Sequence, residues 1–201
     1  MSGKSNALGV SVLAASVVLA VSACGGGGAP DEEISKIDAE GNVLAADAES
    51  WQCLRDNTQD MIWDARSDEE GSFTYRGNTY TWYEPDLEGR EGDEGTKNGG
   101  ECQGSRCDTS GLAEVMNEAQ YCGKDNWRLP TLLDLGGFAE TLPFGTEPLM
   151  AINPYGGGEV WSSTEAAHNT WLAWPRSTHS TRRPGPRSKG YASGVILVAD
   201  D

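Results

Sequence analysis

Short apolar and aromatic runs, separated by polar residues, predict β-hairpins in the first half of the chain. Residues 51–55 and 61–63 are two such runs, and the polar residues 56–60 between them suit a turn. Residues 73–75 and 79–83 repeat the pattern. Aromatic and β-branched residues, which favour strands, dominate both pairs. The pattern therefore predicts two hairpins.

A helical period follows these runs. Four apolar residues recur at a spacing of three or four and would share one helix face: Leu112, Val115, Met116 and Ala119. Thr109 or Ser110 can cap the start of this helix, and Gly123 its end. We therefore expect one amphipathic helix with its apolar stripe on a core.

A second helix is predicted over residues 132–142. Thr131 supplies its N-cap, and Asp134 stands at the third helical position, as in a capping box. Gly136 and Gly137 lower the helix propensity, so we expect a short helix.

The junction before this helix, residues 126–131, is dense in structural residues. Trp127 and, further along, Trp161 are expected in the core. Arg128 is expected to be a buried partner of a carboxylate. We therefore expect the junction to hold the scaffold together and not to contact a ligand.

The last third of the chain has the pattern of a sheet. Residues 160–164 and 170–174 predict a hairpin around residues 165–169. Residues 194–198 are almost continuously apolar, which is typical of a buried strand.

The N-terminus has the pattern of an export signal. Lys4 precedes an apolar run over residues 7–21, which is short for a membrane span. Residues 21–24, Val-Ser-Ala-Cys, resemble a bacterial lipobox, which implies a signal peptide over 1–23 and a lipid on Cys24. A plain secretory signal cleaved before Cys24 is the alternative.

The predicted signal divides the chain into three parts. A flexible Gly-rich and acidic linker is expected over residues 24–49, and one domain over residues 50–201. Gly25, in place of Asp, resembles the sorting pattern of outer-membrane lipoproteins. We therefore expect an exported, lipid-anchored protein at the outer membrane or cell surface.

Charge limits the class of partner. The chain has 31 acidic and 15 basic residues and a net charge of −16. Binding to nucleic acid depends on Lys and Arg contacts with phosphate, so no nucleic-acid partner is expected. The lipid is expected to be the protein's contact with the membrane.

Four cysteines remain once Cys24 is assigned to the lipid. In an exported domain they predict two disulfides, with three pairings open. Cys102 and Cys107 are close enough in sequence for a local bridge. Cys53 and Cys122 would then form the other.

Several motifs occur in an order that one bacterial family shares. They are Trp51-x-Cys53-x-Arg55, Met61-Ile62-Trp63, Tyr80-Thr81-Trp82-Tyr83, Cys102, Cys107-Asp108-Thr109, Cys122-Gly123, Trp127-Arg128-Leu129-Pro130-Thr131 and Trp161-Ser162-Ser163-Thr164. Over about residues 50–199 they resemble the Lcl C-terminal domain family, named for a Legionella collagen-like adhesin.

The resemblance implies a C-type-lectin-like α+β fold, in which two helices pack on antiparallel β-sheet, stabilised by disulfides. It also implies a surface protein related to binders of sugars and glycosaminoglycans. The chain departs from the family in its last strand, where Val195–Ala199 lacks the usual arginines. It also has Gln59-Asp60 where the first hairpin of the family turns on Thr-Gly. Any role of the arginines is therefore not carried over.

Basic residues gather in one predicted loop, residues 175–190. No acid occurs between Glu165 and Asp200. We predict that this loop and two nearby tryptophans bind an extracellular glycan or anionic polymer, because guanidinium groups match sulfate and carboxylate. The predicted ligand residues are Trp171, Trp174, Arg176, His179, Arg182, Arg183, Arg187 and Lys189.

Three alternatives remain open for this loop. In the first alternative, the loop docks on the acidic residues 84–94 of the same domain. In the second, it is a solvated loop without a role. Its Arg, Ser, Thr, His and Gly content also suits a binding surface diversified by a retroelement.

Acidic residues among glycines form a weak candidate for a calcium site, since calcium prefers carboxylate oxygens. The candidates are Glu84, Asp86, Glu88, Asp93 and Glu94. Their spacing does not match an EF-hand, and a solvated loop is the simpler interpretation.

Enzymatic chemistry has little support in the sequence. His168 and His179 are the two histidines, and both lie in loop-like sequence. Ser162 and Ser163 lie in a predicted strand and not in a nucleophile elbow. We therefore predict a lectin-like adhesion domain without enzymatic activity. A structural envelope protein is the first alternative and a hydrolase the last.

Overall fold

A computed structural model describes residues 33–85, 94–141, 158–177 and 184–201. The fold is α+β, with two α-helices, antiparallel sheets and two disulfides. Its elements are β1 (Ile34–Ile37), β2 (Cys53–Asp56), β3 (Met61–Asp64), α1 (Thr109–Glu118), the 3₁₀ turn η1 (Tyr121–Gly123), α2 (Leu132–Thr141), β4 (Glu159–Ala166), β5 (Asn169–Ser177), β6 (Arg187–Ser188) and β7 (Val198–Asp200). In these parts of the chain no helix is long and apolar enough to cross a membrane.

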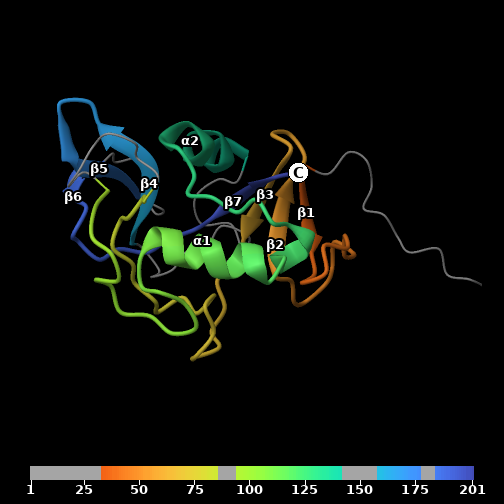
Figure 1. Ribbon diagram of the computed structural model, residues 1–201. Helices are drawn as coiled ribbons and strands as arrows, with labels where there is room; N and C mark the ends of the chain where they lie inside the picture. Colours follow the sequence, from red (N-terminus) through yellow and green to blue (C-terminus); the bar gives the residue numbers. More distant parts are fainter. Residues whose placement is uncertain (1–32, 86–93, 142–157, 178–183) are drawn as a thin grey trace, which may run out of the picture.

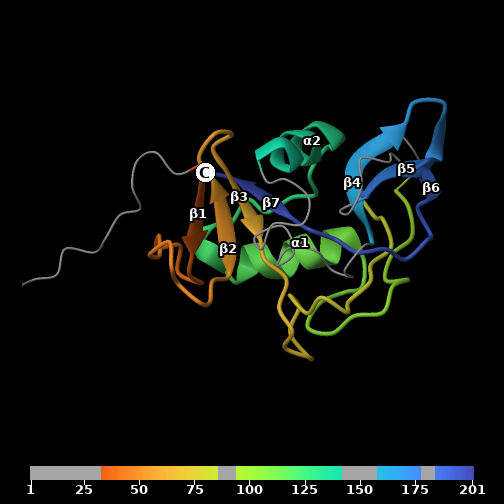
Figure 2. The same cartoon turned by 180° about the vertical axis from the view of Figure 1, so that it is seen from behind.

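The strands form two sheets. One has the order β1-β2-β3-β7 and the other β4-β5-β6, and all paired strands are antiparallel. The sheets lie at opposite ends of the molecule in Figure 1. Figure 2 shows the C-terminal segment running from the smaller sheet to the larger one.

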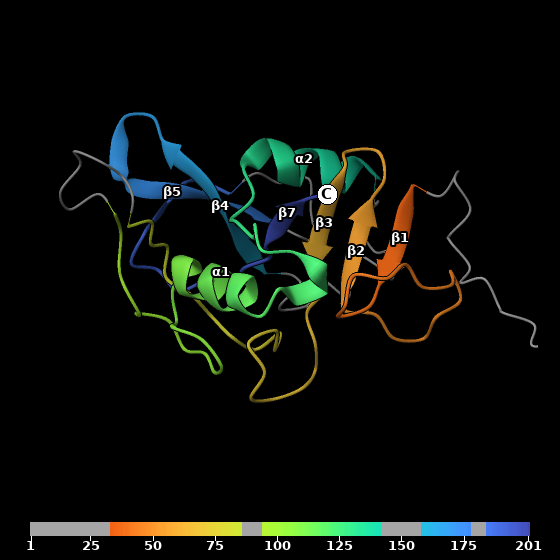
Figure 3. The same ribbon diagram turned by 45° about the vertical axis from the view of Figure 1, so that its right-hand side comes forward.

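Residues 195–199 lie between two hydrophobic cores. Val195, Leu197 and Ala199 pack with α1, whereas Ile196 and Val198 pack with α2. Successive side chains of an extended chain point to opposite sides, so both faces of this segment are buried. Accordingly, β7 is drawn between α1 and α2 in Figure 3. The predicted burial of 194–198 is confirmed, although ladder pairing begins only at Val198.

The first predicted hairpin is confirmed as β2 and β3, with Asp56 opposite Met61. The Asp56 carboxylate accepts hydrogen bonds from the backbone N–H groups of Thr58 and Gln59, at 2.9 and 3.2 Å. These bonds close the polar turn that the sequence predicts.

The predicted linker over 24–49 is wrong for its C-terminal part. Residues 34–37 form β1, which pairs with β2 in the register Ile34 to Asp56, and Ile37 is fully buried. The folded domain therefore begins well before residue 50. A four-residue strand between acidic residues has too little apolar pattern to stand out in the sequence.

The second predicted hairpin, 73–75 with 79–83, is wrong. Tyr80 pairs instead with Ser193, and Tyr83 with Gly95, through isolated bridges. The Asn78 side chain donates to the carbonyl oxygens of Ser72 and Phe73 at 3.0 and 3.3 Å, which holds the preceding residues in turns. The strand-like run 79–83 therefore pairs with distant segments.

Both predicted helices form, with changes at their ends. Asp108, and not Thr109 or Ser110, is the N-cap of α1, and Ala119 is an exposed C-cap. The helix ends before Gly123, which belongs to η1.

The capping box of α2 is confirmed. Asp134 N–H donates to Thr131 Oγ1 at 3.1 Å, and Thr131 N–H donates to Asp134 Oδ2 at 2.8 Å. The hairpin predicted in the last third also forms, as β4 and β5.

Two disulfides join Cys53 to Cys122 and Cys102 to Cys107, across 69 and 5 residues of sequence. The longer loop restricts the unfolded chain more, so the loop-entropy model assigns roughly 4 kcal/mol to the first bridge and roughly 2 to the second. The Cys53 bridge joins the larger sheet to η1, the turn that follows α1.

A buried ion pair lies at the C-terminal end of β3. Arg66 Nη2 lies 2.5 Å from Asp64 Oδ2, and both side chains are almost fully buried. The Asp64 Oδ1 atom accepts the backbone N–H of Leu197 at 2.7 Å. Burial raises the pKa of Asp64 to about 6, although the charge of Arg66 and the Leu197 N–H oppose this.

The raised pKa of Asp64 predicts a pH dependence. Because the folded carboxyl binds its proton more tightly than the unfolded one, its contribution to the free energy of unfolding falls as pH rises from about 4 to about 6, by roughly 3 kcal/mol. The carboxyl ¹³C shift of Asp64 should titrate with a midpoint near 6. Asp64→Asn should remove this signal and flatten the pH dependence of urea unfolding, whereas a midpoint at or below 4 would contradict the assignment.

Candidate functional site

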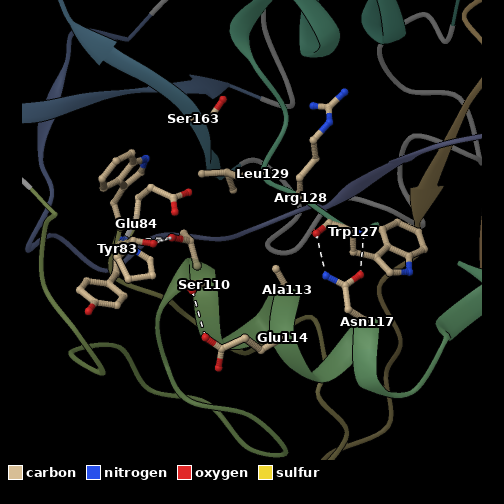
Figure 4. A pocket seen from close by; sticks show the side chains of 13 residues that line it. Tyr83, Glu84, Ser110, Ala113, Glu114, Asn117, Trp127, Arg128, Leu129 and Ser163 are labelled. Atoms are coloured by element: carbon tan, nitrogen blue, oxygen red, sulfur yellow. Dashed lines mark hydrogen bonds between the residues drawn. The ribbon is translucent and has the colours of Figure 1, made fainter. Parts of the chain in front are cut away.

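A pocket of about 270 Å³ lies where three segments of the chain meet (Figure 4). These segments are residues 82–85, one side of α1 from Thr109 to Asn117, and residues 127–129, with one serine of β4. The lining residues are Trp82, Tyr83, Glu84, Pro85, Thr109, Ser110, Ala113, Glu114, Asn117, Trp127, Arg128, Leu129 and Ser163. The motif 127–131, expected to be purely structural, therefore contributes to the pocket.

Asp108 fixes the start of α1 beneath the pocket. Its buried carboxylate accepts the N–H of Gly111 at 2.7 Å through Oδ1 and the N–H of Asn98 at 2.9 Å through Oδ2. Arg106 Nε donates to Oδ2 at 2.7 Å. One carboxylate therefore joins the helix to the loop before it.

Thr109 positions the aromatic wall. Its Oγ1 accepts the backbone N–H of Tyr83 and donates to the Tyr83 carbonyl oxygen, both at 2.9 Å. The threonine hydroxyl thus bonds both backbone groups of Tyr83, as a neighbouring β-strand would. Glu84 follows directly, and in Figure 4 its carboxylate is directed toward Leu129.

Asn117 holds the opposite wall. Its side-chain amide accepts the N–H of Trp127 at 2.6 Å and donates to the Trp127 carbonyl oxygen at 3.1 Å. The Trp127 indole N–H donates to the carbonyl oxygen of Tyr121 at 2.9 Å. With 3% exposure Trp127 belongs to the core, as predicted, and Trp161 is fully buried.

The charged groups around the pocket are paired. Arg106 Nη1 and Nη2 donate to the two Glu114 carboxylate oxygens at 2.7 and 3.0 Å. These hydrogen bonds lower the pKa of Glu114, and those of Glu114 and Asp108 raise the pKa of Arg106. Glu114 is therefore held as a carboxylate.

Arg128 forms ion pairs with Asp134 at 2.9 Å and Asp200 at 3.0 Å. Burial alone would raise the pKa of Asp134, but hydrogen bonds from Arg128 and Thr131 outweigh it and lower that pKa. The predicted pairing is confirmed, but the predicted burial is wrong because 38% of the Arg128 side chain is exposed. Figure 4 shows its guanidinium directed away from α1.

The predicted ligand residues are not a single cluster. Trp171 is 63% exposed on β5, whereas Trp174 and Arg176 of the same strand are partly buried. Arg187 on β6 pairs with Glu159 at 3.1 Å. His179, Arg182 and Arg183 lie outside the described residues, as does Cys24.

Lys189 is not a surface ligand contact. It is 2% exposed, its Nζ lies 2.6 Å from Glu165 Oε1, and the same atom lies 3.8 Å from the Trp82 ring centroid. Arg187 and Lys189 both pair with acids of β4. The alternative of docking on the acidic residues 84–94 falls largely on residues 86–93, which lie outside the described residues.

The calcium candidates are only partly described. Glu84 is exposed, Glu94 is partly buried, and the Glu84 N–H donates to the Glu94 carbonyl oxygen at 2.8 Å. Asp86, Glu88 and Asp93 lie outside the described residues. Within the described ranges, no group of three or more His, Cys, Asp or Glu side chains is placed to hold a metal ion.

Sequence reasoning missed most of the pocket. Tyr83, Thr109 and Asn117 carry no local signal of a site, because their roles depend on contacts across 26 or 10 residues of sequence. The one sequence feature that could have indicated the pocket is the motif at residues 126–131, because a motif of this kind marks a place where several segments meet.

Comparisons of the chain with protein-family models, with curated proteins and with solved structures found no match.

The environment of Lys189 predicts a structural role. Replacing Lys189 with Met removes the buried ammonium that faces Glu165, which should cost on the order of 3 kcal/mol of unfolding free energy. Lys97→Met is the matched control, because Lys97 is exposed and such surface changes cost within about 0.5 kcal/mol. Urea unfolding measures both, and equal stabilities would contradict the burial of Lys189.

Proposed function

We propose that this protein is an exported, lipid-anchored surface protein whose C-type-lectin-like domain binds an extracellular glycan. The lining of the pocket between α1 and residues 82–85 and 127–129 is the observation that carries the proposal. The lipobox at Cys24 and the resemblance to the Lcl C-terminal family support the location and the class of ligand.

The pocket lining matches the surface of a sugar ring. Aromatic and aliphatic groups from Tyr83, Ala113 and Leu129 offer contacts to the C–H groups of a ring. Hydroxyls of Ser110 and Ser163 and nearby carboxylates offer hydrogen bonds to its rim. Its volume of about 270 Å³ is near the lower limit for small-molecule sites, ~300 Å³, which suits one sugar unit of a longer chain.

The pocket is also preorganised. Thr109 and Asn117 each fix a wall through two hydrogen bonds to backbone. A ligand therefore does not have to order these segments, and preorganisation of this kind lowers the cost of binding.

Binding suits the pocket better than hydrolysis. A glycosidase needs a carboxylic acid with a raised pKa as its proton donor. Hydrogen bonds from Arg106 lower the pKa of Glu114 instead. Among the described residues, those that line the pocket include neither histidine nor cysteine.

Filling the pocket should abolish glycan binding. Ala113 is partly buried on α1, and its side chain points toward residues 127–129 in Figure 4. Ala113→Leu places a larger group in the pocket, so affinity for an oligosaccharide found on a glycan array should fall at least about tenfold.

Ala119→Leu is the control, since it makes the same change at the exposed end of α1. It should bind as the unchanged protein does. If no glycan binds at low salt, or if both variants bind equally well, the pocket is not a glycan site. The first of these results favours the structural envelope protein.

An anionic polymer is the second candidate ligand, at the edge formed by β5 and β6. Trp171 and Tyr191 are 63% and 55% exposed there, and the Arg187 guanidinium lies 6.0 Å from the Tyr191 ring centroid. Exposed ion pairs such as Arg187 with Glu159 are weak, so a sulfate group could replace the carboxylate.

Arg187→Ser should weaken heparin binding about threefold to tenfold at low salt, because one guanidinium contact to sulfate is lost. Arg76→Ser is the matched control, since Arg76 also forms a surface ion pair, with Asp68. Surface plasmon resonance on immobilised heparin measures both. Equal losses would show that only the overall charge matters.

A further inference from the structure

We infer that the Cys102–Cys107 bridge is a site of thiol–disulfide exchange, which an external dithiol reduces while the protein stays folded. Its reduction increases the mobility of the residues that fix the start of α1. The Cys53–Cys122 bridge stays intact under the same conditions. The inference goes beyond glycan binding and does not depend on it.

The two disulfides differ in their access to solvent. Cys102 and Cys107 are both partly exposed. Cys53 and Cys122 are 0% and 1% exposed and belong to the α1 core. Reduction begins when a thiolate attacks a disulfide sulfur, so exposed bridges are the labile ones. An external thiolate therefore reaches the shorter bridge first.

The exchange needs a dithiol and no other reactant. One thiolate of the dithiol attacks a sulfur of the bridge and forms a mixed disulfide, while the other cysteine leaves as a thiolate. The second thiolate of the dithiol then attacks the mixed disulfide, which releases the remaining cysteine and leaves the dithiol as a disulfide. Two electrons pass to the bridge, and the two protons of the dithiol end on the cysteines.

Backbone hydrogen bonds hold both ends of the bridged loop without the disulfide. On one side, the Thr79 N–H donates to the Glu101 carbonyl oxygen at 2.8 Å. On the other, the Cys107 carbonyl oxygen accepts the Gly100 N–H at 3.0 Å. The bridge spans only 5 residues of sequence, so it restricts the unfolded chain little. The folded state therefore tolerates its reduction.

The bridge is connected to the start of α1 through side-chain hydrogen bonds. The Cys107 N–H donates to Asn98 Oδ1 at 2.9 Å, and the Asn98 N–H donates to Asp108 Oδ2 at 2.9 Å. Asp108 is the N-cap of α1 and accepts the Gly111 N–H at 2.7 Å. Arg106, which lies within the bridged loop, donates to the same carboxylate at 2.7 Å. Opening the loop removes a covalent restraint on this network.

Thiol trapping tests the selectivity of reduction. The full chain is incubated with dithiothreitol in the absence of denaturant, and alkylated cysteines are located by peptide mass spectrometry. Cys102 and Cys107 should be alkylated at least about thirtyfold faster than Cys53 and Cys122. Oxidised dithiothreitol is the control and should leave all four unalkylated. Equal rates for the two bridges, or alkylation only after denaturant is added, overturn the inference.

Hydrogen exchange tests the connection to α1. In the reduced protein, the backbone N–H groups of Asn98, Cys107 and Gly111 should exchange at least about tenfold faster, because local opening costs less. The Leu197 N–H, which is bonded to Asp64 in the other part of the fold, should exchange as before. The melting temperature should fall by about 4–8 °C.

A double variant separates the loss of the bridge from other effects of the reductant. Cys102→Ser combined with Cys107→Ser should show the faster exchange without dithiothreitol and no further change when it is added. Gln103→Ala is the matched control, since it changes an exposed residue of the same loop and keeps the bridge. It should exchange as the unchanged protein does.

Unchanged exchange at Asn98, Cys107 and Gly111, in both the reduced protein and the double variant, shows that the bridge has no influence on α1 and contradicts the inference. These measurements use no glycan. Their failure therefore leaves the proposed function untouched, and failure of glycan binding leaves the exchange site untouched.

Discussion

The apolar segment 195–199 is the constraint on which the rest of the structure depends. Its side chains alternate between the α1 core and the α2 core, so neither core is complete without it. Each buried aliphatic side chain contributes about 1.5–3 kcal/mol to the free energy of unfolding.

The backbone of the same segment also forms hydrogen bonds to other parts of the fold. Leu197 N–H bonds Asp64, and Val198 exchanges two hydrogen bonds with Arg128. The segment therefore joins the larger sheet to the motif that borders the pocket, and a charged side chain within it would enter one core or the other. This explains why the chain has no arginine there.

The position of the pocket depends indirectly on this segment, because the segment packs against α1, which lines the pocket. The α1 core holds Leu112 and Met116 of the helix, which sets where α1 lies. Asp108 and Thr109 then fix the preceding loop and Tyr83 to the start of the helix through short hydrogen bonds. Most of these bonds use backbone groups of the partner. The shape of the pocket therefore depends little on which side chains line it.

Local signals in the sequence predicted those elements that local interactions form. The helix stripe at Leu112 and Met116, the capping box of Thr131 and Asp134, and the Cys102–Cys107 bridge are confirmed for that reason. The Cys53–Cys122 bridge spans 69 residues and was predicted only as the pair that remained. The second predicted hairpin was wrong because a strand-like run shows that a segment will pair, but not with which segment. Tyr80 pairs with Ser193 and not with residues 73–75. The strand β1 was missed because four residues carry too little pattern. For the site, the sequence favoured exposed cations, whereas the pocket is formed by residues that meet only in three dimensions.

Lys189 shows why a cluster of basic residues need not be a binding surface. In a chain with net charge −16, a cation near β4 is attracted first to the acids of its own fold. Its ammonium lies between Glu165 and the ring of Trp82, and the Trp82 indole N–H donates to the carbonyl oxygen of Ser162 at 2.9 Å. Trp82 also lines the pocket. The lysine therefore ties the smaller sheet to the pocket wall, and its positive charge is used within the domain.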